Sequence, residues 1–571
     1  MTDQRLPVVL FWHMHQPPYR DALSGRYVLP WTWLHAIKDY TDMAAHLEQV
    51  PGAKAVVNFT PVLVEQIEDL AAAVRGALAE GTALPDALLA TLGDAPLPRD
   101  PAARLQLLNA CLRGDRENLI GRHAPLAELS RIALTLNKVE LAAYVSDQFL
   151  YDLAVWYHLA WMGESVRRED ARVARLSAKA RGFDAVDRRQ LLTLVGELLD
   201  GVLPRFRALQ DAGRCELAVS PYSHPILPLL LDFSAARDGE PDSGLPAAPA
   251  YPGGAARAVW HLKRAVACHE RVFGRRPRSC WPSEGAVSVA AVAAIEVAGF
   301  DCLATSVSVL RPSLERSGIP MPERQAEAER LLNQPFALRG SKLSCFFRHD
   351  GYSDLIGFTY SKWHGDDAAA NLVHELAGFA DRTQGEPGRV LLIALDGENA
   401  WEYYPFNGWY FLSAMYEQLA AHPRLKLVTL SEHVDAQRAA GITPAPLPQL
   451  RAGSWVYGTL STWMGDADKN RGWDLLCAAK HAFDEVVEGG TLTSAELARA
   501  EQQLAACEAS DWFWWFGDYN PAEAVRDFDE LFRHQLTSLY RALKLEPPDA
   551  LAVPISAGRG APEAGGVMRR S

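Results

Sequence analysis

Short apolar runs recur along the chain, and most of them end in a polar cluster. Continuous apolar runs of about four to eight residues, rich in β-branched side chains, predict strands that are buried on both faces. Seven clear runs fit this description, and an eighth is weaker: 7–12, 53–59, 215–220, 278–281, 300–306, 342–347 and 389–395, then 425–433. The longer stretches between them have helical periodicity, as in 257–273, which Gly274 can end.

Strands that alternate with helices predict an α/β fold with a parallel sheet. Seven or eight such units indicate a (β/α) barrel whose polar clusters meet at the carboxyl ends of the strands, the rim where barrel enzymes keep their chemistry. We expect this barrel to span residues 1–435. Proline and glycine accumulate near 83–105 and 234–256, so we expect insertions there.

Beyond residue 435 the pattern changes. Residues 436–452 have the composition of a linker, and 453–548 predict a helical domain. Thr493 with Glu496 forms a capping box, and Asn520 before Pro521 predicts another helix start. Residues 549–571 lack apolar periodicity over most of their length and are predicted to be a disordered tail.

Charge and composition exclude several classes of protein. The 571 residues include 70 acidic and 57 basic side chains, a net charge of −13, which argues against a nucleic-acid or anionic-membrane partner. No apolar stretch reaches the roughly 18 residues of a membrane span, and no signal peptide is visible. The eight cysteines form no CxxC pair, which favours reduced thiols. We therefore expect a cytoplasmic protein.

The first predicted strand ends in His13, Met14, His15 and Gln16. His13 and His15 are two residues apart, so both point to one face of the strand. Three interpretations remain open: packing in the core, a metal site like that of the amidohydrolases, or polar recognition of a substrate at the barrel mouth.

Two further strand ends carry carboxylates. Glu284 lies between Pro282 and Gly285, a tight backbone that presents its side chain toward the rim. Apolar residues up to 395 lead into Asp396 and Glu398. Two carboxylates from different strands can flank one bond and share the roles of acid and nucleophile. The spacing does not choose between Asp396 and Glu398.

Several motifs follow one another in the order typical of one family. They are HQPPY, GRCEL running into SPYSHPIL, WPSEGAVS and LDGENAWE, with a fifth candidate in SWVYGTLSTWMGDADKNRGWDLL. On these motifs the chain resembles glycoside hydrolase family 57, which contains α-glucan-active amylases, amylopullulanases, branching enzymes and 4-α-glucanotransferases. The resemblance covers roughly residues 7–545.

This resemblance implies a (β/α)7-type, incomplete TIM-like barrel followed by a C-terminal α-helical domain, and a retaining mechanism. By motif, Glu284 corresponds to the nucleophile and Asp396 to the general acid/base. The resemblance also implies which residues line the substrate groove: His13, His15, Glu216, His224, Trp281 and Trp401. Gln16, Arg348 and Asp350 are further candidates on less specific grounds.

The segment 455–473 mixes indoles with polar groups and is expected to complete the groove. Here Trp463 is predicted to stack on a sugar and Asp468 to bond its hydroxyls. The later tryptophans, Trp512, Trp514 and Trp515, are expected to pack between helices.

The predicted function is hydrolysis or transfer of α-glucan chains, with an α-glucan as the partner and with no cofactor or metal. One alternative is a metal-dependent hydrolase that uses His13, His15, Asp396 and either His224 or His349. Another is a non-catalytic α-glucan-binding protein.

Overall fold

The computed structural model describes residues 4–560. In this part of the chain, seven parallel strands close a barrel in the order β1, β2, β3, β4, β5, β7, β8 and back to β1. Their bounds are β1 Leu6–Met14, β2 Ala55–Phe59, β3 Cys215–Val219, β4 Ser279–Cys280, β5 Cys302–Ser306, β7 Ser344–Arg348 and β8 Leu391–Asp396. All seven clear apolar runs are therefore confirmed as barrel strands, and the (β/α)7-type barrel is the fold of this protein.

Three short strands extend the barrel wall. The weaker run contains β9 (Leu425–Leu427), which pairs with the start of β1. The other two are β6 (Phe336–Leu338), antiparallel to β7, and β10 (Ala445–Leu447), parallel to β6. The predicted linker 436–452 is thus wrong in part, because β10 is hydrogen-bonded into the sheet. A three-residue strand is too short to show a pattern.

Helices surround the barrel and connect its strands. Helix α13 ends at Gly274, whose φ of 73° is left-handed, as the sequence predicts. The surrounding helices are α1 Trp31–His35, η1 Ala36–Tyr40, α2 Thr41–Gln49, α3 Pro61–Glu80, α11 Ala185–Asp211, α12 Leu227–Leu231, α13 Gly254–Phe273, α14 Val289–Val297, α15 Val307–Arg316, α16 Gln325–Leu332, α17 Asp350–Asp354, η5 Leu355–Thr359, η6 Tyr360–Lys362, α18 Gly365–Arg382, α19 Trp409–Ala421 and α20 Leu430–Ala439.

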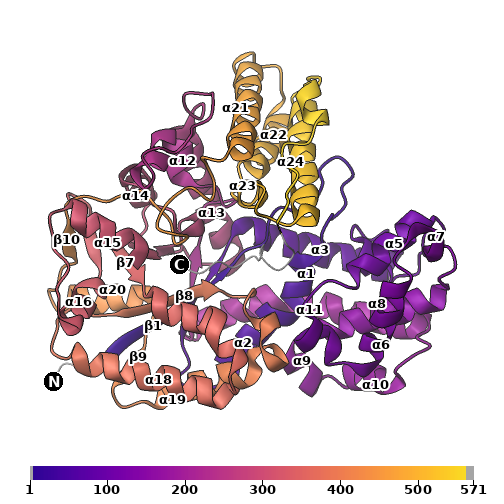
Figure 1. Ribbon diagram of the computed structural model, residues 1–571, viewed down its shortest axis with the longest axis horizontal. Coiled ribbons are helices and arrows are strands. Elements are labelled where there is room, and N and C mark those ends of the chain that lie inside the picture. Colours follow the sequence, from indigo (N-terminus) through magenta and orange to yellow (C-terminus); the bar gives the residue numbers. More distant parts are fainter. Residues whose placement is uncertain (1–3, 561–571) are drawn as a thin grey trace.

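Between α3 and α11 lies a helical insertion, residues 81–184, on the right of Figure 1. It contains α4 Ala87–Ala90, α5 Pro101–Ala110, η2 Arg116–Gly121, α6 Ala124–Thr135, α7 Val139–Ala142, α8 Asp147–Ala160, α9 Glu164–Glu169 and α10 Ala171–Lys179. The predicted insertion at 83–105 is only its beginning. The helices of the insertion have the same periodicity as the barrel helices. In the sequence, the insertion can therefore be recognised only because no strand-like run occurs between residues 60 and 214.

The C-terminal helical domain stands over the barrel, in orange and yellow in Figure 1. It consists of α21 Ala467–Glu488, α22 Ser494–Cys507, α23 Asp511–Trp515, α24 Ala522–Ala542 and η9 Asp549–Ala552. The capping box of Thr493 and Glu496 is present at the start of α22. Helix α24 starts one residue later than predicted, with Pro521 as its cap, because the Asn520 amide donates to the carbonyls of Trp514 and Trp515.

Two segments expected to be irregular pack against this domain. Within 234–256, after the turn η3 (Phe233–Asp238), the N–H groups of Ala247 and Ala248 donate to Asp474 of α21. The predicted disorder of the tail is wrong for residues 549–560. There Ile555 is buried and its N–H donates to Asp529 of α24. The rest of that prediction, 561–571, lies outside the described residues.

Strand residues alternate between two apolar clusters, one inside the barrel and one under the helices. On β1, Val9 and Phe11 belong to the inner cluster, whereas Val8, Leu10 and Trp12 belong to the outer one. This period of two decides which residues at the strand ends point into the barrel mouth.

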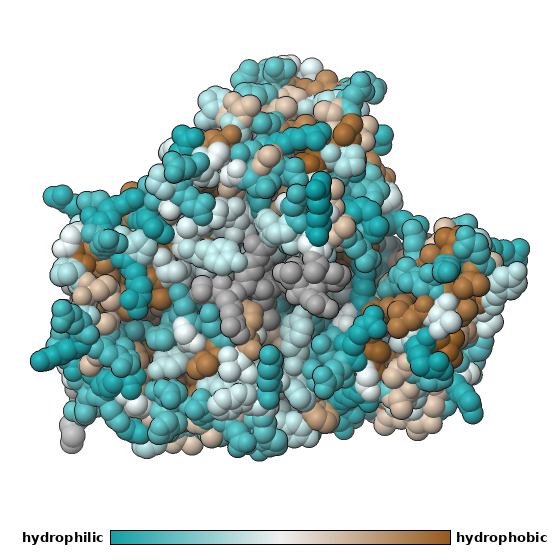
Figure 2. Space-filling view, in the orientation of Figure 1, coloured by the Kyte–Doolittle hydropathy of each residue, from teal (hydrophilic) through white to brown (hydrophobic). Residues whose placement is uncertain are grey.

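The surface seen in Figure 2 is mostly hydrophilic, with hydrophobic residues in scattered groups, several of them on the helical insertion. Among the described residues, no helix combines the length and apolarity that crossing a membrane requires.

Candidate active site

A layer of polar residues closes the inner cluster at the carboxyl ends of the strands. Each of these residues comes two positions after an inward-facing apolar residue of the same strand, so it faces inward as well. The pairs are Phe11 and His13, Phe346 and Arg348, and Ala394 and Asp396. In the β1 register, His13 is opposite Asn58 of β2 on one side and Asp396 of β8 on the other. The apolar pattern of the strands thus brings these polar side chains to one rim.

Asp396 is the last residue of β8 and lines the cavity above the barrel. The Asn399 amide donates to its Oδ2 at 2.8 Å. Burial raises the pKa of Asp396 to about 6, and the Asn399 bond and the nearby His15 and Arg348 oppose this rise. Asp396 therefore retains its proton to a higher pH than an exposed aspartate.

Arg348 is fixed beside Asp396 by several hydrogen bonds. Its guanidinium donates to the Ala394 carbonyl at 3.2 Å and to Asp350 and Asp354 at 2.8 and 3.1 Å. Arg348 also lies over the Trp455 ring, 5.2 Å from its centroid. Asp350 thus positions Arg348, and the arginine brings a fixed positive charge to the cavity.

Glu284 lies in a one-turn 3-10 helix, η4 (Ser283–Gly285), directly after β4. Its φ of 58° is left-handed, a conformation that costs energy for a residue other than glycine. The indole N–H of Trp455 donates to Glu284 Oε2 at 3.0 Å, and the Trp455 backbone N–H donates to the Glu284 carbonyl at 3.2 Å. The segment after β10 therefore holds both the side chain and the backbone of Glu284.

Three histidines stack beside these carboxylates. The ring centroids of His13 and His224 are 5.1 Å apart, and those of His15 and His224 are 3.9 Å apart. Burial, with His15 as the next cause, lowers the pKa of His13 to about 3, and burial also lowers that of His224. Both rings are neutral near pH 7.

The Asn58 amide fixes the tautomer of His13. With its oxygen accepting from the N–H groups of Val219 and Ser220, its nitrogen donates to His13 Nδ1 at 2.5 Å. Since Nδ1 then accepts, the ring proton of neutral His13 is on Nε2. His13 can therefore act as a hydrogen-bond donor in the cavity that it lines.

Glu398 lies beyond the end of β8, where the strand period no longer applies. Its Oε1 accepts from the backbone N–H of His15 and from the Gln16 amide, both at 3.2 Å. Burial, followed by the nearby Asp396, raises the pKa of Glu398 well above its usual range. A protonated Glu398 joins the His15–Gln16 turn to the β8 loop.

The cavity has a volume of about 970 Å³ and is built by three parts of the molecule. The barrel rim supplies its floor. The helical insertion adds residues 113–116 and Trp161, and the C-terminal domain adds Asp511, Trp514, Trp515 and the first turns of α24. The segment between β1 and α2 contributes Tyr19, together with Trp31 and His35 of α1.

Arg113 connects two of these walls across the cavity. Its guanidinium donates to Glu523 at 3.3 Å and to Asp527 at 3.1 Å, so it joins the helical insertion to α24. All three side chains line the cavity. We call this contact the Arg113 bridge.

Six of the predicted site residues line the cavity: His13, His15, Gln16, Glu284, Arg348 and Asp396. A seventh, His224, lies directly behind them. It is fully buried, and its Nδ1 is 3.8 Å from Glu284 Oε1. Both predicted catalytic residues and the motif around His13 are thus brought together.

The predicted places of Trp281 and Trp401 in the lining of the groove, and the predicted stacking of Trp463 on a sugar, are corrected, because all three side chains are almost completely buried. Trp281 packs under Trp455 inside the barrel. Trp401 donates to the Gly397 carbonyl and packs against Trp12, and Trp463 packs behind Trp514. They support the cavity wall rather than form its surface.

The predictions for Glu216 and Asp468 are corrected as well. Glu216 is near the start of β3, at the opposite end of the barrel from the cavity. There it accepts from the hydroxyls of Ser279 and Ser431. Asp468 is in the first turn of α21 and does not line the cavity.

Several cavity residues were missed by the sequence reasoning. Trp455 lies in the predicted fifth segment, but Trp463 was preferred to it. Trp512, Trp514 and Trp515 are all buried, as expected of residues between helices, but Trp514 and Trp515 also line the cavity. Asp511 could have been found from the sequence, because its carboxylate comes directly before this tryptophan cluster. In the structure its Oδ1 is 2.9 Å from His15 Nε2.

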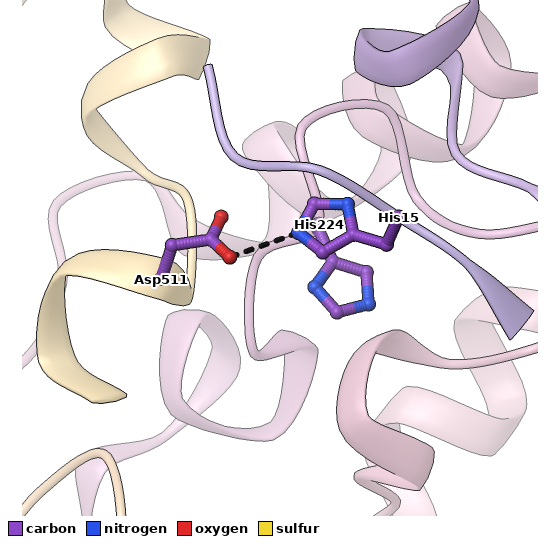
Figure 3. A group of neighbouring side chains, drawn as sticks. All are labelled: His15, His224 and Asp511. Atoms are coloured by element: carbon purple, nitrogen blue, oxygen red, sulfur yellow. Dashed lines mark hydrogen bonds and ion pairs between the residues drawn. The ribbon is translucent and has the colours of Figure 1, made fainter. Parts of the chain in front are cut away.

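The group of residues with metal-ligand geometry differs from the one proposed in the metal-hydrolase alternative. It consists of His15, His224 and Asp511, whose ligand atoms lie within 4.8 Å of one another (Figure 3). His349 caps α17 and stacks on Tyr352. His13 Nδ1 is occupied by Asn58.

A parallel barrel with two carboxylates at its strand ends, in a cavity walled by aromatic side chains, defines an enzyme of the glycoside hydrolase class. The sequence agrees with this class, since the model of glycosyl hydrolase family 57 matches residues 9–446. The chain belongs to glycosyl hydrolase family 57.

Solved structures show a similar fold. One is a branching enzyme of this family from Thermococcus kodakaraensis (15% identity, TM-score 0.56, 94% of this chain and 90% of that one). Another is a branching enzyme from Pyrococcus horikoshii (16%, 0.56, 96% and 98%). A third is the α-amylase AmyC from Thermotoga maritima (12%, 0.54, 95% and 94%). No curated protein matches the chain in sequence.

Proposed function

We propose that this protein cleaves or transfers the glycosidic linkages of α-glucans by a retaining mechanism. One observation carries the proposal. Glu284 and Asp396 enter one cavity from different strand ends and lie in opposite environments. Glu284 accepts an indole hydrogen bond, whereas burial raises the pKa of Asp396 to about 6, so that Asp396 retains its proton to a higher pH than an exposed aspartate. A nucleophile and an acid of a retaining glycosidase need these two states.

In the first step, Asp396 donates its proton to the glycosidic oxygen while Glu284 attacks the anomeric carbon. The bond from this carbon to the leaving oxygen breaks as the ester to Glu284 forms. In the second step, the Asp396 carboxylate takes a proton from water or from a sugar hydroxyl, which attacks the same carbon and releases Glu284. Two inversions give net retention.

Recognition of an α-glucan fits the rest of the cavity. His13 Nε2–H, Arg348 and Gln16 offer donors to sugar hydroxyls, and the rings of Trp31, Trp455, Trp514 and Trp515 offer apolar faces. The branching enzymes and the amylase named above support the same substrate class. All eight cysteines are free and buried, which is consistent with the proposed cytoplasmic location; cell fractionation tests it.

The experiment is incubation of the purified protein with maltoheptaose and chromatography of the products. Shorter sugars alone indicate hydrolysis, and a ladder of shorter and longer sugars indicates transfer. New α-1,6 linkages, found by debranching the products, indicate branching. Proton NMR during the reaction gives the stereochemistry at the anomeric carbon, which we expect to be retained.

Glu284→Gln and Asp396→Asn are expected to abolish nearly all turnover. The matched control is Glu296→Gln, which neutralises a glutamate outside the cavity and should leave turnover unchanged. Anomeric inversion would exclude Glu284 as the nucleophile. Unchanged maltoheptaose that nevertheless binds would favour the non-catalytic alternative.

A further inference from the structure

Three side chains from distant parts of the chain converge at one place (Figure 3), and one of them, His224, lies next to the proposed nucleophile. His15 follows β1, His224 lies in the turn after β3, and Asp511 begins α23. His15 and Asp511 line the cavity, and His224 is fully buried behind them. Two imidazoles and one carboxylate are a donor set that binds Zn²⁺ in proteins.

Two atoms of this group have no hydrogen-bond partner among the described residues. They are His224 Nε2 and Asp511 Oδ2, and both are buried. A buried polar atom without a partner lowers the stability of the fold. A cation between the three side chains would give both atoms a partner. This observation is independent of their spacing.

The other ring nitrogen of each histidine is already held in place. His15 Nδ1 is 3.0 Å from the Thr60 hydroxyl, and His224 Nδ1 is 3.0 Å from the Ser510 hydroxyl. Metal-binding histidines usually make such a bond through the second nitrogen, which fixes the ring orientation. When each Nδ1–H donates to its hydroxyl, each Nε2 has a lone pair to offer.

Binding requires only local changes. His15 Nε2 now faces Asp511 Oδ1 at 2.9 Å, so a cation would replace this hydrogen bond. The rings of His15 and His224 stack with an angle of 26° between their planes. Since the lone pair of each nitrogen lies in the plane of its ring, both rings have to turn before their nitrogens face one ion.

We propose that His15, His224 and Asp511 form a binding site for a divalent cation of the Zn²⁺ type, and that the bound ion inhibits the enzyme. The site opens into the cavity through His15 and Asp511, which leaves room for water as a further ligand. His224 Nδ1 is 3.8 Å from Glu284 Oε1. A cation on His224 Nε2 would lie across the imidazole ring from this carboxylate and attract its negative charge, and through His15 and Asp511 it would take up space in the cavity.

Zinc binding is measured on the full-length protein by titration calorimetry with ZnCl₂ and by metal analysis after dialysis. We expect one Zn²⁺ per chain. His224→Gln and Asp511→Asn should each weaken binding about 100-fold or more, since each removes a ligand. The control is His35→Gln, because His35 also lines the cavity but its Nδ1 is held by Asp39 at 2.6 Å.

X-ray absorption of the zinc-loaded, unsubstituted protein tests the site without relying on variants that fail to fold. We expect nitrogen and oxygen neighbours with the scattering pattern of two imidazoles. Sulfur neighbours would assign the zinc to cysteines and overturn the proposal. The absence of stoichiometric zinc, or binding that persists in both ligand variants, would overturn it as well.

The inhibitory effect rests on the proposed function and has a separate measurement. Stoichiometric Zn²⁺ should reduce maltoheptaose conversion at least tenfold, and EDTA should restore it. Activation or no change would overturn the inhibitory role. A protein inactive with and without zinc, yet showing the expected metal site, would contradict the proposed function and leave the cation site standing.

Discussion

At the scale of single residues, Asp396 has the property on which the proposed reaction most depends. It must be protonated to act as the acid, and burial raises its pKa to about 6. We therefore predict that kcat/KM falls as the pH rises above about 6, by about tenfold per pH unit. Initial rates on maltoheptaose between pH 4.5 and 8.5 give this profile.

The control for this prediction is Asp396→Asn. Its residual activity should lose the decrease on the alkaline side, because an amide does not titrate. A wild-type profile that stays flat up to pH 8 would contradict the role of Asp396.

Trp455 holds the other carboxylate. We predict that Trp455→Phe lowers kcat by about 10- to 100-fold, because a hydrogen bond to a charged group contributes about 1.5–3 kcal/mol and here orients the nucleophile. KM should change much less. Steady-state kinetics check both, and Trp31→Phe, at another indole of the cavity, is the control. A change confined to KM would show that Trp455 only binds substrate.

At the scale of helices and strands, sequence patterns predict the barrel well because each strand carries its own signal. The apolar period also places His13, Arg348 and Asp396 at the rim. Glu216 was assigned to the groove from the family motif, but this part of the motif lies at the start of β3, at the opposite end of the barrel from the cavity. A pattern does not show which tryptophan of a cluster reaches the cavity, since that depends on the packing of α21, α23 and α24.

Trp463 provides a test at this scale. We predict that Trp463→Ala destabilises the protein by about 3–5 kcal/mol, because its side chain is fully buried behind Trp514 and truncation leaves a cavity. KM of the folded fraction should change little. Urea unfolding and steady-state kinetics measure the two effects.

For Trp31→Ala we predict the opposite pattern of effects on KM and stability. Trp31 lines the cavity and is only partly buried, so its removal should raise KM and affect stability less. If Trp463→Ala raised KM without loss of stability, Trp463 would have to reach the substrate after all.

At the scale of the whole molecule, the cavity belongs to no single segment. The barrel, the helical insertion and the C-terminal domain each supply a wall, and Arg113 is about four hundred residues from its partners Glu523 and Asp527 along the chain. Nothing local in the sequence signals such a contact, which explains why the insertion wall was not predicted.

The Arg113 bridge ties the helical insertion to α24 in the cavity lining, so we expect it to limit how far these two walls can separate. An exposed ion pair is worth about 0.2–1 kcal/mol, hence the bridge opens readily. We predict that Arg113→Ala raises kcat/KM for glycogen relative to maltoheptaose by about two- to fivefold, because a branched polymer needs the wider opening. High salt should have a similar effect on the wild type.

Arg131→Ala is the matched control, since Arg131 pairs with Glu128 on the exposed surface of the same insertion. It should leave the ratio of the two substrates unchanged. An equal change in both variants would mean that the Arg113 bridge does not select substrates.

The left-handed backbone of Glu284 implies that the position of this residue in the proposed reaction lowers the stability of the fold. A residue held at φ 58° costs about 1–3 kcal/mol, a cost that selection for stability alone would remove.

Glu284→Asn and Glu284→Gln both replace the carboxylate by an amide, but asparagine tolerates this conformation better. We therefore expect the Asn variant to melt at a higher temperature than the Gln variant, by an amount equivalent to about 1 kcal/mol in calorimetry. Equal melting temperatures would mean that the turn is not under strain. If the difference is found, the turn that presents the nucleophile is under strain, and the stability that it costs has to be recovered elsewhere in the fold.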